Sequence, residues 1–483
     1  MKSKIVNLLR STFVLFINFF ENRELKIPQI LSLGIVLALF GYAFRYFTFS
    51  VSVLDWDEIT YFIMGKGILL GKIPYVDLWD IKPIGIYLIH AISLLVLPYH
   101  TEVLRWTSFL HLLGLAMVVS SFVKNQSWIQ RLFCGTLVLY FFSRLSSGLS
   151  ANSEIYFLFY EWLGISFFFR KNSISISFFL LGIAFLIKYI IFFDVVFLGL
   201  YALWKRSEST SFLRICLEMS TFVIPIGTSI LIYYFLGHSQ EFFDALLTVS
   251  SKHQTNETIG FPFGTLISLF WPLFFLGFVT LLSDRKFTSY KIVLVALTLT
   301  ALLGASYTGY YFQHYFLALV PPLAILATPA RKVSWQLSIF ALFLVLYSWN
   351  SVSNRWKKDL SHIPDHSRII AENIQKLGGG TVFVASGVHA TYIFLNQLSP
   401  TEYVQPVNYI DPLFSKNFDV DVKKVFREIK GVDFIQWCHQ TQLEKADQDL
   451  TLNQDFVHPL QILVKENYPK KETPLAGCDI YYK

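Results

Sequence analysis

Charged side chains crowd into one short interval of this otherwise apolar chain. Asp55-Trp56-Asp57-Glu58 comes first, followed by Gly71-Lys72-Ile73-Pro74-Tyr75 and then by Asp80-Ile81-Lys82-Pro83. Hydrophobic segments flank the interval on both sides, so we expect it at a membrane surface. Charges near a bilayer are costly unless they are solvated, paired or used, and the interval therefore predicts a functional site. The plainer alternative is an ordinary solvated loop.

Asp57 and Lys82 are the residues of this interval best suited to chemistry. A carboxylate at the water–lipid boundary can take a proton from a hydroxyl group, so Asp57, with Glu58 beside it, is the candidate general base. Lys82 could stabilise the charge that develops on a phosphate, and Pro83 favours a helix start whose positive dipole end also suits phosphate. The structural alternatives are that Asp57 caps a helix starting at Glu58, and that Lys82 snorkels.

Further polar residues interrupt the apolar segments later in the chain. Arg144, Asn152 and Glu154 lie in and after a polar break, where a plain solvated loop is the alternative. Lys188 stands inside an apolar run, so it must pair, snorkel or face a cavity. Either it binds phosphate, or it forms a purely structural pair with Asp194.

The segment from Tyr307 to Tyr315 is rich in tyrosine and leads into a span broken by proline. Aromatic rings with hydroxyl groups, such as Tyr311 and Tyr315, suit stacking on a sugar. His314 could bind phosphate, bind a metal or share a proton transfer. An interfacial aromatic belt explains the tyrosines as well, but it explains His314 less well.

A divalent cation, Mg²⁺ or Mn²⁺, is a candidate cofactor. Asp57, Glu58, Asp77 and Asp80 could supply the oxygen ligands that such ions prefer. No spacing among these acids demands a metal, and none is certain.

Composition indicates the elements that must position these residues. The chain has 483 residues, of which 54% are apolar, with 48 Phe and a formal net charge of +7. This composition is typical of a multispanning membrane protein, and the positive charge fits contact with anionic lipid headgroups. No basic aromatic stripe indicates nucleic acid as a partner. Residues 1–24 predict an interfacial helix rather than a signal peptide.

About 11–13 spans are expected in residues 1–350, with the charged interval at about 50–82 as the first outer loop. The expected spans cover residues 28–49, 83–98, 106–123, 132–149, 155–170, 174–188, 190–204, 213–236, 263–282, 290–306, 314–330 and 334–350. Counting every early segment as a crossing would put Glu154 and Asp57 on opposite faces, whereas basic loops put both outside. One segment between 83 and 149 therefore does not cross.

Residues 351–483 predict a small soluble α/β domain, because charged residues are about twice as dense there as before. Arg368 to Leu377 is expected as a helix ended by glycines, Thr381 to Ala385 as a strand, Lys423 to Ile429 as a helix, and Val432 to Ile435 as a strand. Cys438 and Cys478 could form a disulfide if this domain is outside the cytoplasm.

The order of these motifs resembles a known superfamily. An acidic pair after the first span, a Gly-x-x-Pro-Tyr element at Gly71 to Tyr75 and a Lys-Pro start at Lys82 are similar to polytopic GT-C glycosyltransferases. These are the protein O-mannosyltransferase and aminoarabinose transferase-like enzymes of the glycosyltransferase 39-type family. The aminoarabinose enzymes carry an acid where this chain has Ile81 and an arginine where it has Thr60, so their metal and phosphate details are not carried over.

The resemblance implies an α-helical membrane enzyme with Asp57 as base and a polyprenyl-phosphate sugar as donor. It also implies phosphate or substrate contacts from Lys82, Asp80, Arg144, Glu154, Lys188, Tyr311, His314 and Tyr315. The acceptor would be an envelope lipid, such as lipopolysaccharide, a glycan or a protein. Site and C-terminal domain are expected on the extracytoplasmic face of a bacterial inner membrane. The alternative is a flippase or transporter of lipid-linked glycans, since broken spans with Lys188 and Asp194 at depth suit that class too.

Overall fold

A computed structural model describes most of the chain. It covers residues 27–123, 127–205, 211–249, 262–283, 288–307, 309, 311–328, 365–438 and 452–483, together with single residues and short runs between 339 and 356. The interfacial helix expected at 1–24 and most of the span expected at 334–350 lie outside the described residues.

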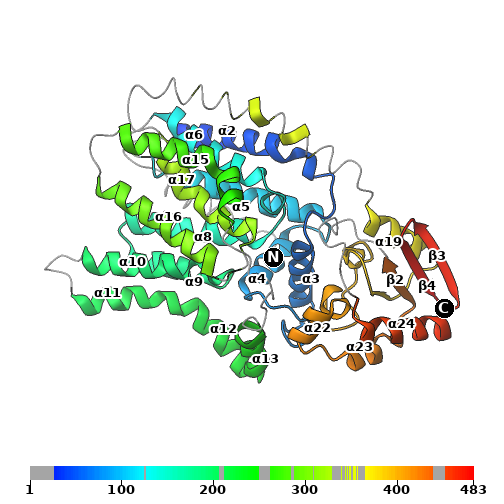
Figure 1. Cartoon of the computed structure of the whole chain (residues 1–483). Coiled ribbons are helices and arrows are strands. Elements are labelled where there is room, and N and C mark those ends of the chain that lie inside the picture. Colours follow the sequence, from blue (N-terminus) through cyan, green and yellow to red (C-terminus); the bar gives the residue numbers. More distant parts are fainter. Residues whose placement is uncertain are drawn as a thin grey trace.

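Helices dominate the first part of the chain (Figure 1). They are α2 (Ile27–Arg45), α3 (Trp56–Leu69), α4 (Gly85–Val96), α5 (Glu102–Ser120), α6 (Trp128–Ser143), α7 (Ser146–Leu149), α8 (Ser153–Arg170), α9 (Ile174–Phe185), α10 (Phe192–Trp204), α11 (Phe212–Met219), α12 (Val223–Leu236), α13 (Ser239–Phe243), α15 (Phe263–Ser283), α16 (Ser289–Tyr307) and α17 (Val320–Leu326). Short 3₁₀ segments are η1 (Tyr46–Thr48), η2 (Tyr189–Ile191), η3 (Ser220–Phe222) and η5 (Gln313–Leu319), and η4 (Asp244–Val249) is π-helical.

Five stretches among the described residues are long and apolar enough to cross a membrane by length and composition. They are Ile27–Thr48, Glu102–Ser120, Phe212–Leu236, Phe263–Leu282 and Ser289–Tyr307. Four shorter apolar helical stretches accompany them, as the short expected spans indicated: Gly85–Val96, Ile174–Phe185, Tyr189–Trp204 and Gln313–Leu326. The predicted class, a polytopic helical membrane protein with a small C-terminal α/β region, is confirmed.

Helix ends that are distant in sequence meet at one end of the bundle. Arg45, at the end of α2, donates to the carbonyl oxygens of Gly148 and Leu149 at 2.6 and 2.5 Å. Arg105, near the start of α5, donates to Glu58 Oε2 at 2.8 Å, and the amide of Ala151 donates to the same oxygen at 2.7 Å. The end of α2 and the starts of α3, α5 and α8 are therefore neighbours.

This meeting point brings Glu154 and Asp57 to the same end of the bundle. Helices α5 and α6 run away from this end and return to it, and Glu154 lies on the first turn of α8, which starts there. The chain also returns to this end after α4, because Arg105, near the start of α5, lies beside Glu58.

The first part of the polar interval forms the helix α3, and the part that carries Asp77, Asp80 and Lys82 is the connection between α3 and α4. Asp55 is the N-cap of α3, and its side chain accepts from the amide of Asp57 at 3.0 Å, which satisfies a donor of the first turn. The alternative in which Asp57 itself caps a helix starting at Glu58 is therefore wrong. Gly65 lets α3 pack closely on α4, since a β-carbon there would lie 2.8 Å from the amide nitrogen of Ala91.

The C-terminal region is a four-stranded sheet in the order β1-β2-β4-β3 with short helices around it. Strands β1 (Val382–Val384) and β2 (Phe434–Cys438) are parallel, while β4 (Cys478–Tyr482) is antiparallel to β2 and to β3 (Lys470–Leu475). The helices are α19 (His366–Lys376), α20 (Thr391–Phe394), α21 (Val407–Ile410), α22 (Pro412–Asn417), α23 (Val422–Ile429) and α24 (Gln454–Asn467). The expected helices and strands are all found, within a few residues at their ends.

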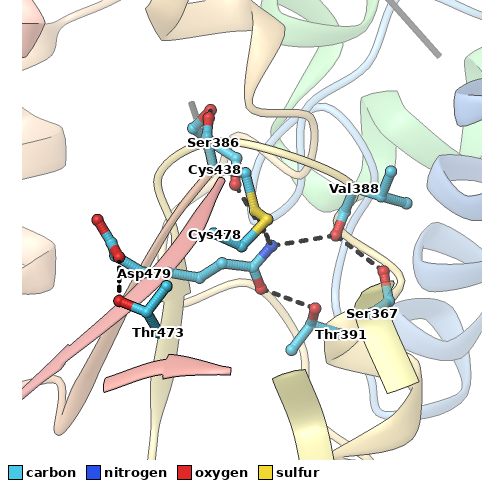
Figure 2. The surroundings of a disulfide bond; sticks show 9 residues. Ser367, Ser386, Val388, Thr391, Cys438, Thr473, Cys478 and Asp479 are labelled. Atoms are coloured by element: carbon cyan, nitrogen blue, oxygen red, sulfur yellow. Dashed lines mark hydrogen bonds between the residues drawn. A yellow bond between two sulfur atoms is a disulfide. The ribbon is translucent and has the colours of Figure 1, made fainter. Parts of the chain in front are cut away.

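Cys438 and Cys478 form a disulfide. They face each other in the register of β2 and β4, and Figure 2 shows the bond beside Ser386 and Thr391. The pairing left open by the sequence is thus present.

The C-terminal domain rests on α3 and on the connection that follows it. The amide of Trp79 donates to the carbonyl of Glu402 at 2.7 Å, and Thr60 Oγ1 lies 2.9 Å from His389 Nε2. Ser52 also bonds to Asp365 at the start of α19. In Figure 1, α3 lies between the helical bundle and the C-terminal sheet. The domain therefore holds the element that carries Asp57.

Candidate active site

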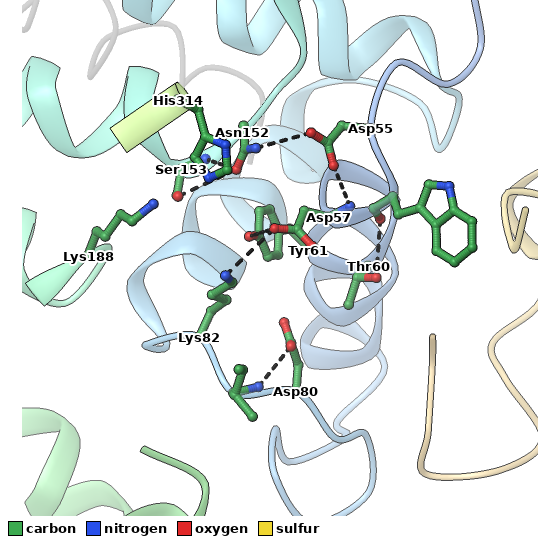
Figure 3. A network of polar contacts seen from close by, with 12 residues as sticks. Asp55, Asp57, Thr60, Tyr61, Asp80, Lys82, Asn152, Ser153, Lys188 and His314 are labelled. Atoms are coloured by element: carbon green, nitrogen blue, oxygen red, sulfur yellow. Dashed lines mark hydrogen bonds and ion pairs between the residues drawn. The ribbon is translucent and has the colours of Figure 1, made fainter. Parts of the chain in front are cut away.

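Asp57 lies on the first turn of α3, and its side chain is partly exposed. Its Oδ2 accepts from the hydroxyl of Tyr61 at 2.9 Å and forms an ion pair with Lys82 Nζ at 3.7 Å. The side chains of Asp57 and Lys82 remain 32% and 27% exposed, and Figure 3 shows the two side chains pointing toward one another. Tyr61 is one helical turn after Asp57, which puts both side chains on one face of α3.

The ion pair fixes the charge state of both partners. Burial disfavours the charged form of Asp57, but the charge of Lys82 and the hydrogen bond from Tyr61 outweigh it and lower the pKa of Asp57. Burial likewise opposes the charge of Lys82, and Asp57 overcomes this and raises the pKa of Lys82. At neutral pH the site therefore holds a carboxylate, which is the form that a general base needs.

A second charged cluster stands opposite the first. Lys188 Nζ bonds to Glu154, and His314 Nε2 lies 3.8 Å from Glu154 Oε1. The ammonium of Lys188 also sits over the ring of Tyr315, 4.0 Å from its centroid, in a cation–π contact. Lys188 and His314 are close enough to Asp57 to act on its charge, so the two clusters form one site (Figure 3).

Glycine and helix breaks bring these clusters together. The amide of Gly85, at the start of α4, donates to the carbonyl of Leu186 at 2.8 Å, and a β-carbon on Gly85 would lie 2.5 Å from that oxygen. This approach places Lys82, just before α4, near Lys188, which follows α9. Asn152 caps α8 through the amide of Ser153 at 2.8 Å, and thereby sets the position of Glu154.

The pair that the sequence suggested for Lys188 is wrong. Asp194 instead accepts from Thr300 Oγ1 on α16 at 2.6 Å and shares a hydrogen bond with Glu161 on α8. Lys188 precedes the 3₁₀ turn η2, whereas Asp194 follows it on the first turn of α10, so their side chains serve different neighbours.

Glu58 is held in the protein interior, unlike its neighbour Asp57. Both of its oxygens bond to Arg105, and they also accept from the amides of Leu54 at 2.8 Å and Ala151 at 2.7 Å. These donors occupy the carboxylate of Glu58 and leave its side chain without solvent exposure. The geometry suits an anchor that joins α3, α5 and the start of α8.

Asp80 lies beside Lys82 but is turned into the protein. It accepts from the amide of Ile81 and the hydroxyl of Tyr87, each at 2.8 Å. Burial raises the pKa of Asp80 to about 6, with Lys82 acting against the rise.

Three further sequence candidates lie apart from this cluster or at its edge. Asp77 accepts from the amide of Ile73 at 2.7 Å and pairs with Lys72 at 3.6 Å. Arg144 donates to the carbonyl of Leu269 at 3.1 Å and does not join the Asp57 cluster. Tyr311 lies in a left-handed backbone conformation, with φ of 48°, shortly before His314.

The four acids considered as metal ligands are not gathered into one donor set. Within the described ranges, no group of three His, Cys, Asp or Glu side chains could hold a metal ion. Glu58 is committed to Arg105 and Asp77 to Lys72, which leaves Asp57 and Asp80 on either side of a lysine. The donor set does not fit a resident Mg²⁺ or Mn²⁺, and no step below uses one.

Two site residues were not singled out from the sequence. Asp55 accepts from Asn152 Nδ2 at 3.2 Å, and burial together with the charge of Asp57 raises the pKa of Asp55 to about 8. Tyr61 donates to Asp57. The helical spacing from Asp57 to Tyr61 is the signal that would have identified Tyr61, had the interval been predicted as a helix.

Comparisons with known proteins give similarity in structure only. The chain matches no family model, and no curated protein matches its sequence. Among solved structures, the apo oligosaccharyltransferase of Archaeoglobus fulgidus aligns with a TM-score of 0.47 and 11% identity over 85% of this chain and 69% of that one.

Two other structures from this organism align at similar levels. Oligosaccharyltransferase AglB with an inhibitory peptide and a dolichol-phosphate aligns with a TM-score of 0.47 and 12% identity, over 84% of this chain and 69% of that one. The oligosaccharyltransferase in complex with Zn and sulfate aligns with a TM-score of 0.44 and 11% identity, over 84% of this chain and 67% of that one. At this similarity, the function has to be inferred from the site itself.

Proposed function

We propose that this protein is an integral membrane glycosyltransferase that moves a sugar from a polyprenyl-phosphate carrier to a hydroxyl group of an envelope acceptor. The observation that carries the proposal is one partly exposed carboxylate, Asp57, facing the ammonium groups of Lys82 and Lys188 and the imidazole of His314. A base beside several phosphate-binding groups is the set that such a transfer requires.

The reaction is a single displacement. Asp57 takes the proton of the acceptor hydroxyl, whose oxygen attacks the anomeric carbon of the sugar. The bond between that carbon and the phosphate oxygen breaks, and its electron pair stays on the polyprenyl phosphate. Lys82 and Lys188 stabilise that charge. One displacement inverts the anomeric centre, since a retaining route needs a second, nucleophilic carboxylate.

The carrier's apolar chain has a surface to lie on. A shallow pocket of about 420 Å³ between α9, α10 and α11 is lined almost entirely by apolar side chains, among them Phe178, Val195, Gly199 and Leu203. Val195, the first residue of α10 that lines it, comes seven residues after Lys188 in the sequence. A chain whose phosphate sits at Lys188 could therefore continue along α10.

The proposed orientation puts the site on the extracytoplasmic face. Support comes from the disulfide between Cys438 and Cys478, because such bonds persist mainly in oxidising compartments. The C-terminal domain that carries the disulfide contacts α3 through Thr60 and His389, so domain and site belong on one side. A bacterial inner membrane is the expected location.

The test follows release of polyprenyl phosphate from a panel of polyprenyl-phosphate sugars by mass spectrometry, with purified protein and an envelope extract as acceptor. Wild type should release the carrier only with extract present. Asp57→Asn should lower the rate by at least about 100-fold, the usual contribution of a general base. Asp77→Asn is the matched control, since Asp77 lies in the same interval and pairs with Lys72 instead.

Two negative results are possible in this test, and they have different meanings. Appreciable turnover by Asp57→Asn would refute the assignment of the base. No release from any donor, with folded wild-type protein, would refute the transferase and favour a transporter of lipid-linked glycans.

A further inference from the structure

Tyr75 holds an unusual backbone conformation beside the candidate phosphate site. Its φ is 68°, in the left-handed region that glycine and asparagine adopt readily and that a bulky side chain disfavours. The turn itself is closed by the amide of Tyr75, which donates to the carbonyl of Leu78 at 2.6 Å. Because glycine would make the same turn without strain, the side chain of Tyr75 must supply something that glycine lacks.

The side chain reaches the backbone of Lys82. The hydroxyl of Tyr75 donates to the carbonyl oxygen of Lys82 at 2.7 Å, and the hydroxyl of Tyr87 on α4 lies 3.0 Å from the same oxygen. Both tyrosines are buried, so this hydrogen bond is shielded from water. The hydroxyl of Tyr87 gives its proton to Asp80, so the hydroxyl of Tyr75 is the group that fixes the main chain from which the Lys82 ammonium extends toward Asp57.

Helices α12 and α13 in turn hold Tyr75 in place. Tyr233 on α12 donates through its hydroxyl to the carbonyl of Pro74 at 3.1 Å. The rings of Tyr233 and Phe242 on α13 each lie 5.8 Å from the ring of Tyr75, and 4.5 Å from one another. The three rings are buried together, which leaves Tyr75 little freedom to move.

We propose that Tyr75 is a positioning residue for the transfer reaction, with Tyr233 and Phe242 as its support. It sets where the Lys82 ammonium stands relative to Asp57 and to the donor phosphate. The segment of α12 and α13 is thereby coupled to the phosphate site, although it contributes no charge to it. This inference rests on the proposed function, in which Lys82 binds the phosphate.

The test uses Tyr75→Phe, which removes the hydroxyl and keeps the packed ring. Donor KM should rise and kcat/KM should fall about tenfold, the range expected for one buried hydrogen bond. Tyr99→Phe is the matched control. The ring of Tyr99 stacks on Phe62 of α3, and its buried hydroxyl has no hydrogen-bond partner among the described residues. That variant should leave KM and kcat at wild-type values.

A double variant separates positioning of Lys82 from a general loss of structure. In a Lys82→Met background, Tyr75→Phe should cost no more than about twofold, because the group that it positions is gone. Tyr233→Phe should act in the same direction as Tyr75→Phe in wild type, and more weakly.

Three outcomes would overturn the inference. They are wild-type kinetics for Tyr75→Phe, equal losses for Tyr75→Phe and Tyr99→Phe, or an undiminished loss in the Lys82→Met background. Wild-type protein that transfers no sugar would instead count against the proposed function itself. Failure of the proposed function can thereby be distinguished from failure of the inference about Tyr75.

Discussion

At the scale of single residues, Asp57 and Glu58 show how neighbours in sequence take different roles. Asp57 faces Lys82 and keeps a third of its surface open, while Glu58 turns inward to Arg105 and to two backbone amides. A carboxylate whose lone pairs are already taken by donors is a poor proton acceptor, whereas Asp57 has capacity left. Of the two carboxylates, Asp57 is therefore better placed to accept a proton.

The dependence of Asp57 on Lys82 makes a pH prediction. A general base works only when ionised, so activity is lost as pH falls through the pKa of Asp57, which Lys82 lowers. For wild type, the acidic limb of kcat/KM should lie below about pH 4, the ordinary value for aspartate. Lys82→Met removes the lowering charge, so the limb should move to higher pH, in addition to any loss of phosphate binding.

The measurement is kcat/KM against pH for the two proteins with one donor. Lys72→Met is the control, because Lys72 pairs with Asp77 at 3.6 Å rather than with Asp57. An acidic limb at the same pH in Lys82→Met and wild type would show that Asp57 does not titrate in the limb, or that Lys82 does not act on it.

At the scale of elements, the lipid-facing surface of α10 makes a prediction about the carrier. Gly199 lines the apolar pocket, and a β-carbon there would meet only Met219 at 3.7 Å and Phe178 at 3.9 Å, which is ordinary contact. Gly199→Leu should therefore fold and fill part of the pocket. Each buried CH₂ of the carrier contributes about 0.8 kcal/mol, so losing a few such contacts should raise KM about tenfold or more for a long-chain donor.

A donor with a short chain should be unaffected, since it would end before the pocket. The assay compares KM for long-chain and short-chain polyprenyl-phosphate sugars. Gly227→Leu on α12 is the control, because nothing lies within 4 Å of a β-carbon at Gly227. Equal KM changes for both chain lengths in Gly199→Leu would place the carrier elsewhere.

The same elements show what the sequence could and could not predict. The spans and the C-terminal strands follow from apolar runs and their breaks, which a single sequence displays directly. Helix α3 was anticipated only as an alternative, a short helix starting at Glu58, because its start is charged and its packing on α4 depends on Gly65, a residue type that disfavours helix. The close contact of Gly65 with α4 explains why this position suits glycine. That contact is evident only once the position of α4 is known.

The pairing of charged side chains across the bundle was the second feature that the sequence could not predict. Lys188 bonds to Glu154 on another helix rather than to Asp194, which is its nearest acid along the chain. Sequence proximity favoured the wrong partner for Lys188. The turn η2 lies between Lys188 and Asp194, so their side chains point toward different helices. The sequence placed Asp57 and Lys82 in one charged interval, but their 3.7 Å contact required the fold.

At the scale of the whole molecule, the C-terminal domain and the bundle meet along α3. Thr60 contacts His389, and Trp79 packs against Phe418 with ring centroids 4.9 Å apart. Since Thr60 and Trp79 both lie between Asp57 and Lys82 in the sequence, the domain braces the site from outside the bundle. It need not supply a reacting group to matter for the rate, because a loosened α3 would move the base.

The compartment of that domain can be read from its cysteines. The chain has four, of which Cys438 and Cys478 are bonded, while Cys134 is a buried thiol and Cys216 a partly exposed one. Protein isolated from membranes and denatured with an alkylating reagent, without reductant, should therefore carry the label on Cys134 and Cys216 alone. After reduction all four should be labelled, and peptide mass spectrometry reads both states.

The matched control is Cys438→Ser, in which the label should appear on Cys478 without reductant. The bond closes a loop with a sequence separation of 40, so its loss should lower the stability of the domain by about 2–5 kcal/mol. Because α3 rests on this domain, transfer in Cys438→Ser should lose its heat resistance before it loses its rate at low temperature. Labelling of all four cysteines in unreduced wild type would instead place the domain in a reducing compartment, and would overturn the extracytoplasmic orientation of the site.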